Sequence, residues 1–170
     1  MSRTVQAKRA AFRALHAEGC FVLPNPWDVG SALMLQGLGF QALASTSSGF
    51  AWSTGHADGS SSREAVLAHL RLLCSATDLP VNADFESGYA ANADSVHESV
   101  RMAIATGVAG LSIEDSTGDP ARPVRDVAEA VARLRTGRAG SPVESSIESP
   151  ATPVAIAIRT LSWTPSALAA

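Results

Sequence analysis

The chain has 170 residues, a length that fits one domain with a buried core. Its formal net charge is −3, from 13 Lys and Arg against 16 Asp and Glu, which excludes the basic surface typical of nucleic-acid binding. Hydrophobic residues make up 46% of the sequence without any apolar run of 18 residues, so we expect a globular cytoplasmic protein with neither nucleic-acid nor membrane partners.

Hydrophobic periodicity predicts alternating helices and strands along the chain. Apolar residues three and four positions apart indicate helices, and short apolar runs bounded by turn residues indicate strands. In chain order, the predicted elements are a helix over 4–18, a strand over 20–24, a helix over 29–38, a strand over 41–46, a helix over 63–76, a strand over 80–84, a helix over 94–106, a strand over 109–114, a helix over 124–135 and a strand over 154–158.

Two stretches interrupt this alternation. Residues 47–62 form a polar, glycine-rich segment that is too long for a simple connection, so we expect a functional loop there. Residues 136–153 are rich in Gly, Ser and Pro and predict an irregular break. Residues 161–170 show no usable periodicity. We interpret residues 1–170 as a single domain that contains the break.

Apolar strands that alternate with helices predict an α/β fold, in which outer helices cover a parallel sheet. No Gly-x-Gly-x-x-Gly opens a helix after the first strand, so a (β/α) barrel is favoured over a dinucleotide-binding sheet. A complete barrel takes about 250 residues. The prediction is therefore a partial TIM-type barrel of about five strands, which makes the domain incomplete. A weaker alternative is a response-regulator-like binding module, which would require a lysine at the fifth strand.

Residues 81–89 carry the main chemical signal. On an extended strand, Asn82, Asp84 and Glu86 share one face, because side chains two positions apart point the same way. Neighbouring carboxylates repel each other unless a cation lies between them, and a hard divalent ion with oxygen ligands is the usual solution. The alternative is a solvated strand end without a ligand.

Four segments in register resemble the isocitrate lyase / phosphoenolpyruvate mutase superfamily, and within it the carboxyvinyl-carboxyphosphonate phosphorylmutase-like proteins. They are Asn25–Ala32, Thr46–Phe50, Asn82–Tyr89 and Gly110–Asp115. The resemblance covers residues 10–135, with a weaker match near 154–160. It implies a TIM-type barrel, Mg²⁺ or Mn²⁺, homo-oligomers, and cleavage or formation of a C–C or P–C bond beside a pyruvate-type enolate.

The resemblance also implies a role for each matching residue. The implied metal-binding residues are Asp84, Glu86, Asp58 and Glu114, of which Asp84 is tied most directly to the ion. Catalytic roles are implied for Asp58, Glu114 and Arg159. Substrate binding, to a carboxylate or phosphonate, is implied for Arg159 and for the turn formed by Ser48, Gly49 and Phe50, whose backbone N–H groups face the ligand.

One segment departs from the family pattern. Isocitrate and 2-methylisocitrate lyases carry Lys-Lys-Cys-Gly-His or Lys-Arg-Cys-Gly-His after the strand that corresponds to 109–114, whereas residues 116–122 read Ser-Thr-Gly-Asp-Pro-Ala-Arg. Leu161 also replaces a glutamate of the family. We therefore expect a Mg²⁺-dependent lyase or phosphomutase-like enzyme for a small 2-oxo acid rather than a tricarboxylate. The alternative is a non-catalytic, C-terminally truncated homologue.

Overall fold

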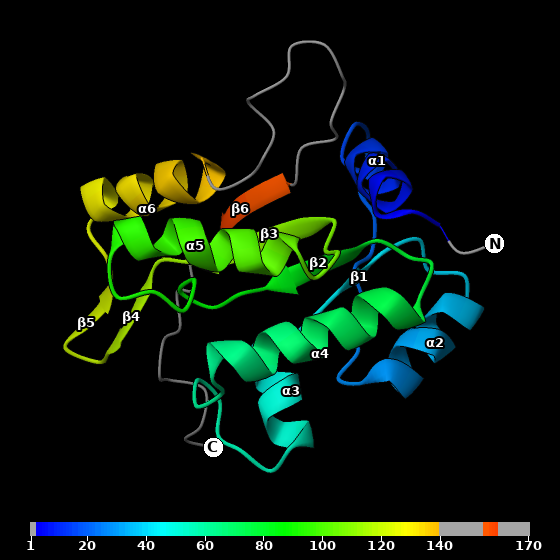
Figure 1. Cartoon of the computed structure of the whole chain (residues 1–170), viewed down its shortest axis with the longest axis horizontal. Coiled ribbons are helices and arrows are strands. Elements are labelled where there is room, and N and C mark those ends of the chain that lie inside the picture. Colours follow the sequence, from blue (N-terminus) through cyan, green and yellow to red (C-terminus); the bar gives the residue numbers. More distant parts are fainter. Residues whose placement is uncertain (1–2, 140–154, 160–170) are drawn as a thin grey trace.

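Helices and parallel strands alternate along the residues that the computed structural model describes, 3–139 and 155–159 (Figure 1). A four-stranded sheet has the order β1-β2-β3-β6, and every neighbouring pair in it is parallel. The elements are α1 (Val5–Leu15), α2 (Val29–Gly37), β1 (Leu43–Ala44), α3 (Ser47–Ser53), α4 (Arg63–Ala76), β2 (Val81–Asp84), α5 (Ala93–Ile104), β3 (Gly110–Glu114), β4 (Ser116–Asp119), β5 (Arg122–Val124), α6 (Val127–Ala139) and β6 (Ala155–Arg159).

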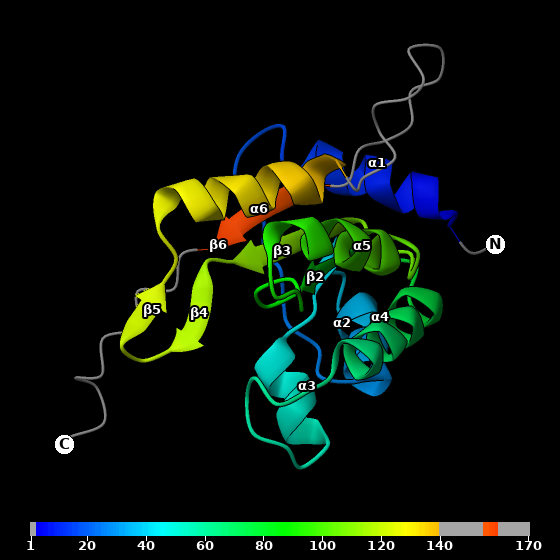
Figure 2. The same ribbon diagram turned by 60° about the vertical axis from the view of Figure 1, so that its left-hand side comes forward.

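The predicted α/β fold is confirmed as a partial barrel with outer helices. Helix α2 packs on α4, α4 on α5, and α5 on α6, so the helices follow one another around the outside of the sheet (Figures 1 and 2). The core lies between these helices and the strands. Along β2, Val81 and Ala83 are buried while Asn82 and Asp84 are only half-buried, so the polar face of the strand points away from the helices.

Helix α1 closes the amino-terminal end of the sheet. Phe12 is 2% exposed and packs against Ala42 and Ala109, which directly precede β1 and β3. The guanidinium of Arg9 donates to the backbone carbonyls of Val108 (3.1 Å) and Ile104 (3.0 Å). Figure 2 shows α1 on the opposite side of the sheet from α3 and the β4–β5 hairpin. Helix α1 therefore covers the amino end of the sheet, while α3 and the hairpin lie at its carboxyl end.

Lys8 of α1 anchors the end of α4. Its buried ammonium donates to the carbonyls of Cys74 (2.8 Å) and Thr77 (2.5 Å), at the carboxyl end of that helix. Lys8→Ala leaves both carbonyls without this donor, so we expect the free energy of unfolding to fall by about 2–4 kcal/mol. Denaturant melts measure the loss, with the exposed Arg71→Ala as control. Equal stability of the two variants would contradict this role.

The cysteines are free thiols, in line with the absence of any cysteine pattern in the sequence. Cys74 is buried in α4, and this burial raises the pKa of its thiol to about 11. Because the thiolate is the reactive form, Cys74 serves as a small core residue rather than a nucleophile. None of the described helices is both long and apolar enough to cross a membrane.

Two predicted elements, the first strand and the irregular break, are corrected by the structure. Residues 20–24 form no strand, and the contact of this segment with β1 is the bond from Ala44 N to Pro24 O (3.1 Å). Proline has no N–H with which to extend a ladder, so the sheet starts at β1, and four of the five predicted strands form. The predicted break is helical up to Ala139, because α6 runs past the predicted end. Residues 140–153 and 161–170 lie outside the described residues.

The predicted loop 47–62 is helical in its first half. Residues Ser47–Ser53 form α3, although this segment is rich in serine and glycine. Thr46 caps the helix, because its side-chain oxygen accepts from Gly49 N at 3.2 Å. Such a hydroxyl cap satisfies one of the otherwise unpaired N–H groups of a first helical turn. The helix begins directly after β1 and so lies at the carboxyl end of the sheet.

Candidate functional site

A cavity of about 580 Å³ lies at the carboxyl end of the sheet. It is formed where α3, the loop after α3, the end of β2, the end of β3 and the β4–β5 hairpin meet. Its lining residues are Thr46, Ser47, Ser48, Asp58, Gly59, Asp84, Glu86, Ser87, Glu114, Ser116, Thr117 and Gly118. The lining is therefore mostly hydroxyl and carboxylate, and it holds all four acids that the sequence predicted as metal-binding.

Asp84 links β2 to α3. One of its carboxylate oxygens accepts from the backbone N–H of Ser47 and from its hydroxyl, both at 2.9 Å. The backbone N–H of Asp84 in turn donates to the hydroxyl of Ser45 at 2.9 Å. Both bonds from Ser47 are made to Oδ2, and together they fix the orientation of the carboxylate. Asp84 is thus held rigidly at the cavity wall.

Glu86 reaches the cavity by a different route from the one predicted. The strand ends at Asp84, and Glu86 adopts a left-handed backbone with φ 44°, so the expected strand alternation does not continue to it. Its carboxylate accepts from the Tyr89 hydroxyl at 2.7 Å, and its backbone carbonyl accepts from Glu114 N at 2.7 Å. The turn therefore brings Glu86 beside Glu114, even though the strand pattern that predicted its position is wrong.

The carboxylates influence one another across the cavity. Burial raises the pKa of Glu86, and the negative charges of Asp84 and Asp58 raise it further, while the bond from Tyr89 opposes the rise. Burial also raises the pKa of Tyr89, and its hydrogen bond to Glu86 adds to this effect. A carboxylate with raised pKa beside other acids is the electrostatic sign of a site that favours a cation.

The predicted substrate-binding turn is split by the structure. Ser48 lines the cavity, and its hydroxyl lies 3.1 Å from that of Thr46. Gly49 and Phe50 are not among the lining residues, and their backbone N–H groups donate to the side chain and carbonyl of Thr46. Phe50 instead stacks on His69, with ring centroids 4.2 Å apart. Substrate contact by Ser48, Gly49 and Phe50 stays a prediction.

Arg159 is the last residue of β6. The register of the sheet pairs it with Glu114, the last residue of β3. This pairing puts the Arg159 backbone at the carboxyl end of the sheet, where the cavity opens. Its predicted catalytic and substrate-binding roles, like those of Asp58 and Glu114, stay predictions.

The β4–β5 hairpin was missed by the sequence reasoning. Its strands are antiparallel, with Ser116 opposite Val124 and Asp119 opposite Arg122. Gly118, at φ 75°, lies within β4, where the pairing register shifts, and the turn follows at Pro120 and Ala121. The sequence Gly-Asp-Pro over 118–120 is the signal that could have indicated the hairpin. The hairpin contributes the hydroxyls of Ser116 and Thr117 to the cavity.

The donor set can be tested against Mg²⁺. Within 3–139 and 155–159, no three His, Cys, Asp or Glu side chains lie where they could hold a metal ion between them. The four acids instead surround a cavity with room for water. Mg²⁺ prefers oxygen ligands and keeps several waters, so this set fits an ion held largely through water. The assignment of Asp84, Glu86, Asp58 and Glu114 to a metal stays a prediction.

We expect His69 to make the stability of the fold dependent on pH. It is 8% exposed, and its Nε2 has no hydrogen-bond partner in the described part of the chain. Burial lowers the pKa of His69, although Asp28 partly offsets the shift. Below a pH of about 6.5 the unfolded chain therefore binds more protons, and we expect the unfolding free energy to fall by up to about 1.4 kcal/mol per pH unit.

Denaturant melts between pH 8 and pH 5 measure this dependence. In His69→Leu the unfolding free energy should fall less steeply towards pH 5, because the leucine side chain binds no proton. His56→Gln, in an exposed loop, should leave this pH dependence unchanged. If the unfolding free energy of His69→Leu fell as steeply as that of the wild type, the acid sensitivity would belong to another group.

Comparison with known sequences gives the family context. Residues 12–147 match the sequence model of the phosphoenolpyruvate phosphomutase family. An uncharacterised Mycobacterium tuberculosis protein is 36% identical over 125 residues, which cover 73% of this chain and 46% of that protein. The 2-methylisocitrate lyase of Escherichia coli is 32% identical over 134 residues, 74% of this chain and 45% of the enzyme. The chain spans about half the length of these curated relatives.

Solved structures share the fold. A Burkholderia cenocepacia protein described as a lyase/mutase aligns with a TM-score of 0.82 at 38% identity, over 92% of this chain and 55% of that one. A 2,3-dimethylmalate lyase aligns with a TM-score of 0.74 at 26% identity, over 94% and 54% of the two chains. A phosphonopyruvate hydrolase bound to oxalate and Mg²⁺ aligns with a TM-score of 0.76 at 22% identity, over 94% of this chain and 53% of that one. At this identity the likeness is one of fold.

Proposed function

Because the chain belongs to the phosphoenolpyruvate phosphomutase family, within the isocitrate lyase / phosphoenolpyruvate mutase superfamily, we propose that it acts on a small 2-oxo acid with the help of Mg²⁺. The bond broken is the C–C or P–C bond at the carbon next to the carbonyl. The observation that carries the proposal is the cavity in which four acids converge: Asp58 from the loop after α3, Asp84 and Glu86 from the end of β2, and Glu114 from the end of β3.

Asp84 and Glu86 are the central residues for the metal. Asp84 is oriented by Ser47, and Glu86 by Tyr89, so neither carboxylate needs to be reordered when an ion arrives. Asp58 and Glu114 add negative charge across the cavity. When bound, Mg²⁺ would supply a Lewis acid that draws charge from the oxygen of the developing enolate. A relative with the same fold was solved with oxalate and Mg²⁺, which supports this choice of ion.

The cavity lining favours a small polar substrate. Ser48 and Ser116 supply hydroxyl groups, whereas the Thr117 hydroxyl donates to the carbonyl of Arg122. The lining residues include no cysteine, lysine or histidine. The 2-oxo acid keeps the electron pair of the broken bond as an enolate, and the departing group leaves as CO₂ or is taken up by water as phosphate. Without a thiol acid, the proton that converts the enolate to pyruvate comes from solvent. Arg159 is proposed to bind the carboxylate or phosphonate of the substrate.

Turnover assays test the proposal directly. We expect pyruvate from oxaloacetate or phosphonopyruvate in the presence of Mg²⁺ or Mn²⁺, no pyruvate after chelation by EDTA, and little cleavage of 2-methylisocitrate. A preference for 2-methylisocitrate would overturn the argument from the absent cysteine. No Mg²⁺ binding and no turnover on any of the three would favour the non-catalytic alternative.

A further inference from the structure

The turn that follows β2 is conformationally strained. Among the described residues, Glu86 (φ 44°) and Tyr89 (φ 49°) are the non-glycine residues with positive φ. A left-handed backbone costs a non-glycine residue roughly 1–2 kcal/mol. Such conformations persist only where surrounding contacts determine them, and they gather at functional sites. The question is which contacts hold this turn.

Arg133 of α6 makes those contacts from outside the cavity. Its side chain is almost fully enclosed, with 3% of the residue exposed. One terminal nitrogen, Nη2, donates to the carbonyl of Ser87 at 2.7 Å and to that of Ala90 at 2.8 Å. These two carbonyls bracket Tyr89. A single guanidinium therefore fixes both ends of the strained turn against α6.

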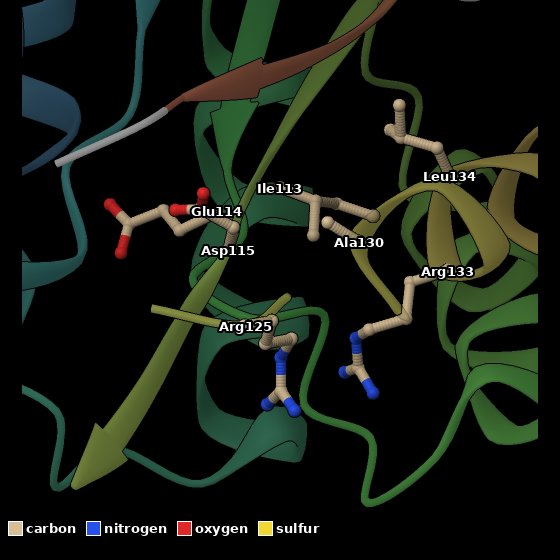
Figure 3. A pocket seen from close by; sticks show the side chains of 7 residues that line it. All are labelled: Ile113, Glu114, Asp115, Arg125, Ala130, Arg133 and Leu134. Atoms are coloured by element: carbon tan, nitrogen blue, oxygen red, sulfur yellow. The ribbon is translucent and has the colours of Figure 1, made fainter. Parts of the chain in front are cut away.

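The remainder of the Arg133 guanidinium is poorly compensated. In the described ranges, its Nε and Nη1 have no hydrogen-bond partner. Arg133 lines a cavity of about 10 Å³, room for one water, together with Ile113, Glu114, Asp115, Arg125, Ala130 and Leu134. Figure 3 shows the guanidinium of Arg125 beside that of Arg133. Burial lowers the pKa of Arg133 and the nearby positive charge of Arg125 lowers it further, while the negative charge of Glu129 opposes the shift.

This placement is costly for a purely structural residue. A buried charge with unmade hydrogen bonds stabilises a fold poorly, and an apolar side chain of similar size often serves as well or better. The feature that an apolar side chain could not reproduce is the pair of bonds to Ser87 and Ala90.

A short chain of contacts leads from those bonds to the cavity. Tyr89, between the two clamped carbonyls, donates its hydroxyl to a carboxylate oxygen of Glu86. Ring packing of Tyr89 on Phe85, with centroids 5.0 Å apart, sets the direction of that hydroxyl. We propose that Arg133 is a positioning residue, which clamps the Ser87–Ala90 turn so that Tyr89 holds the Glu86 carboxylate in the cavity. The contacts of this clamp are independent of the proposed function, but the reason for positioning Glu86 rests on it.

The only tyrosine of the chain, Tyr89, allows a direct test. Tyrosine labelled with ¹³C at Cζ gives a single NMR line, whose shift depends on the hydrogen bond to Glu86. In Arg133→Met we expect this line to move to the position of a solvent-exposed phenol, and amide exchange over 86–90 to speed up by at least about tenfold. Arg135→Met, an exposed arginine on the same helix, is the matched control and should change neither.

A conservative variant separates positioning from folding. Arg133→Lys keeps a donor that can reach one carbonyl, so its line should lie between those of the wild type and Arg133→Met. If Arg133→Met does not fold, Arg133→Lys decides on the same measurement. The proposal would be overturned if a folded Arg133 variant were less stable than the wild type but kept the Tyr89 line at the wild-type position.

Activity and metal binding form a separate arm. If the proposed reaction occurs, Arg133→Met should lower kcat by about 10–100-fold with KM within about threefold, because a shift of about 1 Å in the Glu86 carboxylate would misplace the ion that it helps to hold. If the Tyr89 line of the wild-type protein does not shift when Mg²⁺ is added, this result would contradict the proposed metal site but not the role of Arg133. The clamp would still stand if the Arg133 variants moved that line.

Discussion

Asp84→Asn should lose Mg²⁺ affinity by about 100-fold or more while keeping the fold. The asparagine side chain has the same shape as aspartate, and its oxygen can still accept from the N–H and hydroxyl of Ser47. What disappears is one negative charge at the centre of the acid cavity. Without that charge, the remaining carboxylates attract a divalent cation less strongly, and turnover of a 2-oxo acid should fall in parallel.

Isothermal titration with Mg²⁺ and Mn²⁺ measures this change. The matched control is Asp119→Asn, which removes an exposed acid of the β4–β5 hairpin that is not among the lining residues. We expect the control to bind Mg²⁺ like the wild type and both variants to melt within a few degrees of it. Equal affinity in Asp84→Asn and wild type would show that the metal, if bound, lies elsewhere.

Elements with strong local signals were predictable from the sequence. The helix predicted over 63–76 coincides with α4, because Ser62 caps it and regularly spaced leucines form its buried face. The convergence of the acids was predictable for a related reason, since the carboxyl ends of parallel strands meet at one edge of a sheet. Correct prediction of where β2 and β3 end was enough to place Asp84 and Glu114 at the same edge.

Features that depend on tertiary contacts were not predictable. Serine and glycine over 47–53 favour a loop, but the Thr46 cap and the bond from Ser47 to Asp84 stabilise a helix instead. The left-handed turn at Glu86 has no glycine at that position to indicate it. Arg133 stands in a helix where arginine is normally exposed, and only the fold brings it to the carbonyls of Ser87 and Ala90.

Gly110→Ala should cause a large loss of stability, because it overpacks the amino end of the sheet. A methyl group at Gly110 would collide with the ring of Phe12 and lie 2.5 Å from the side-chain oxygen of Asn82. Phe12 cannot withdraw, because it fills the amino end of the sheet between Ala42 and Ala109. We expect the free energy of unfolding to fall by about 3 kcal/mol, near the upper end for overpacked cores, measured by denaturant melts.

The collision can be assigned by a double-mutant cycle with Phe12→Leu. Alone, Phe12→Leu should destabilise the fold, because the smaller side chain leaves part of the amino end unfilled. Combined with Gly110→Ala, it makes room for the methyl group, so the double variant should be more stable than Gly110→Ala. Gly37→Ala is the control, since its added methyl group meets no atom within 4 Å and alanine favours the helix. Additive losses in the cycle would place the effect of Gly110→Ala away from Phe12 and thus contradict the packing of α1 against β3.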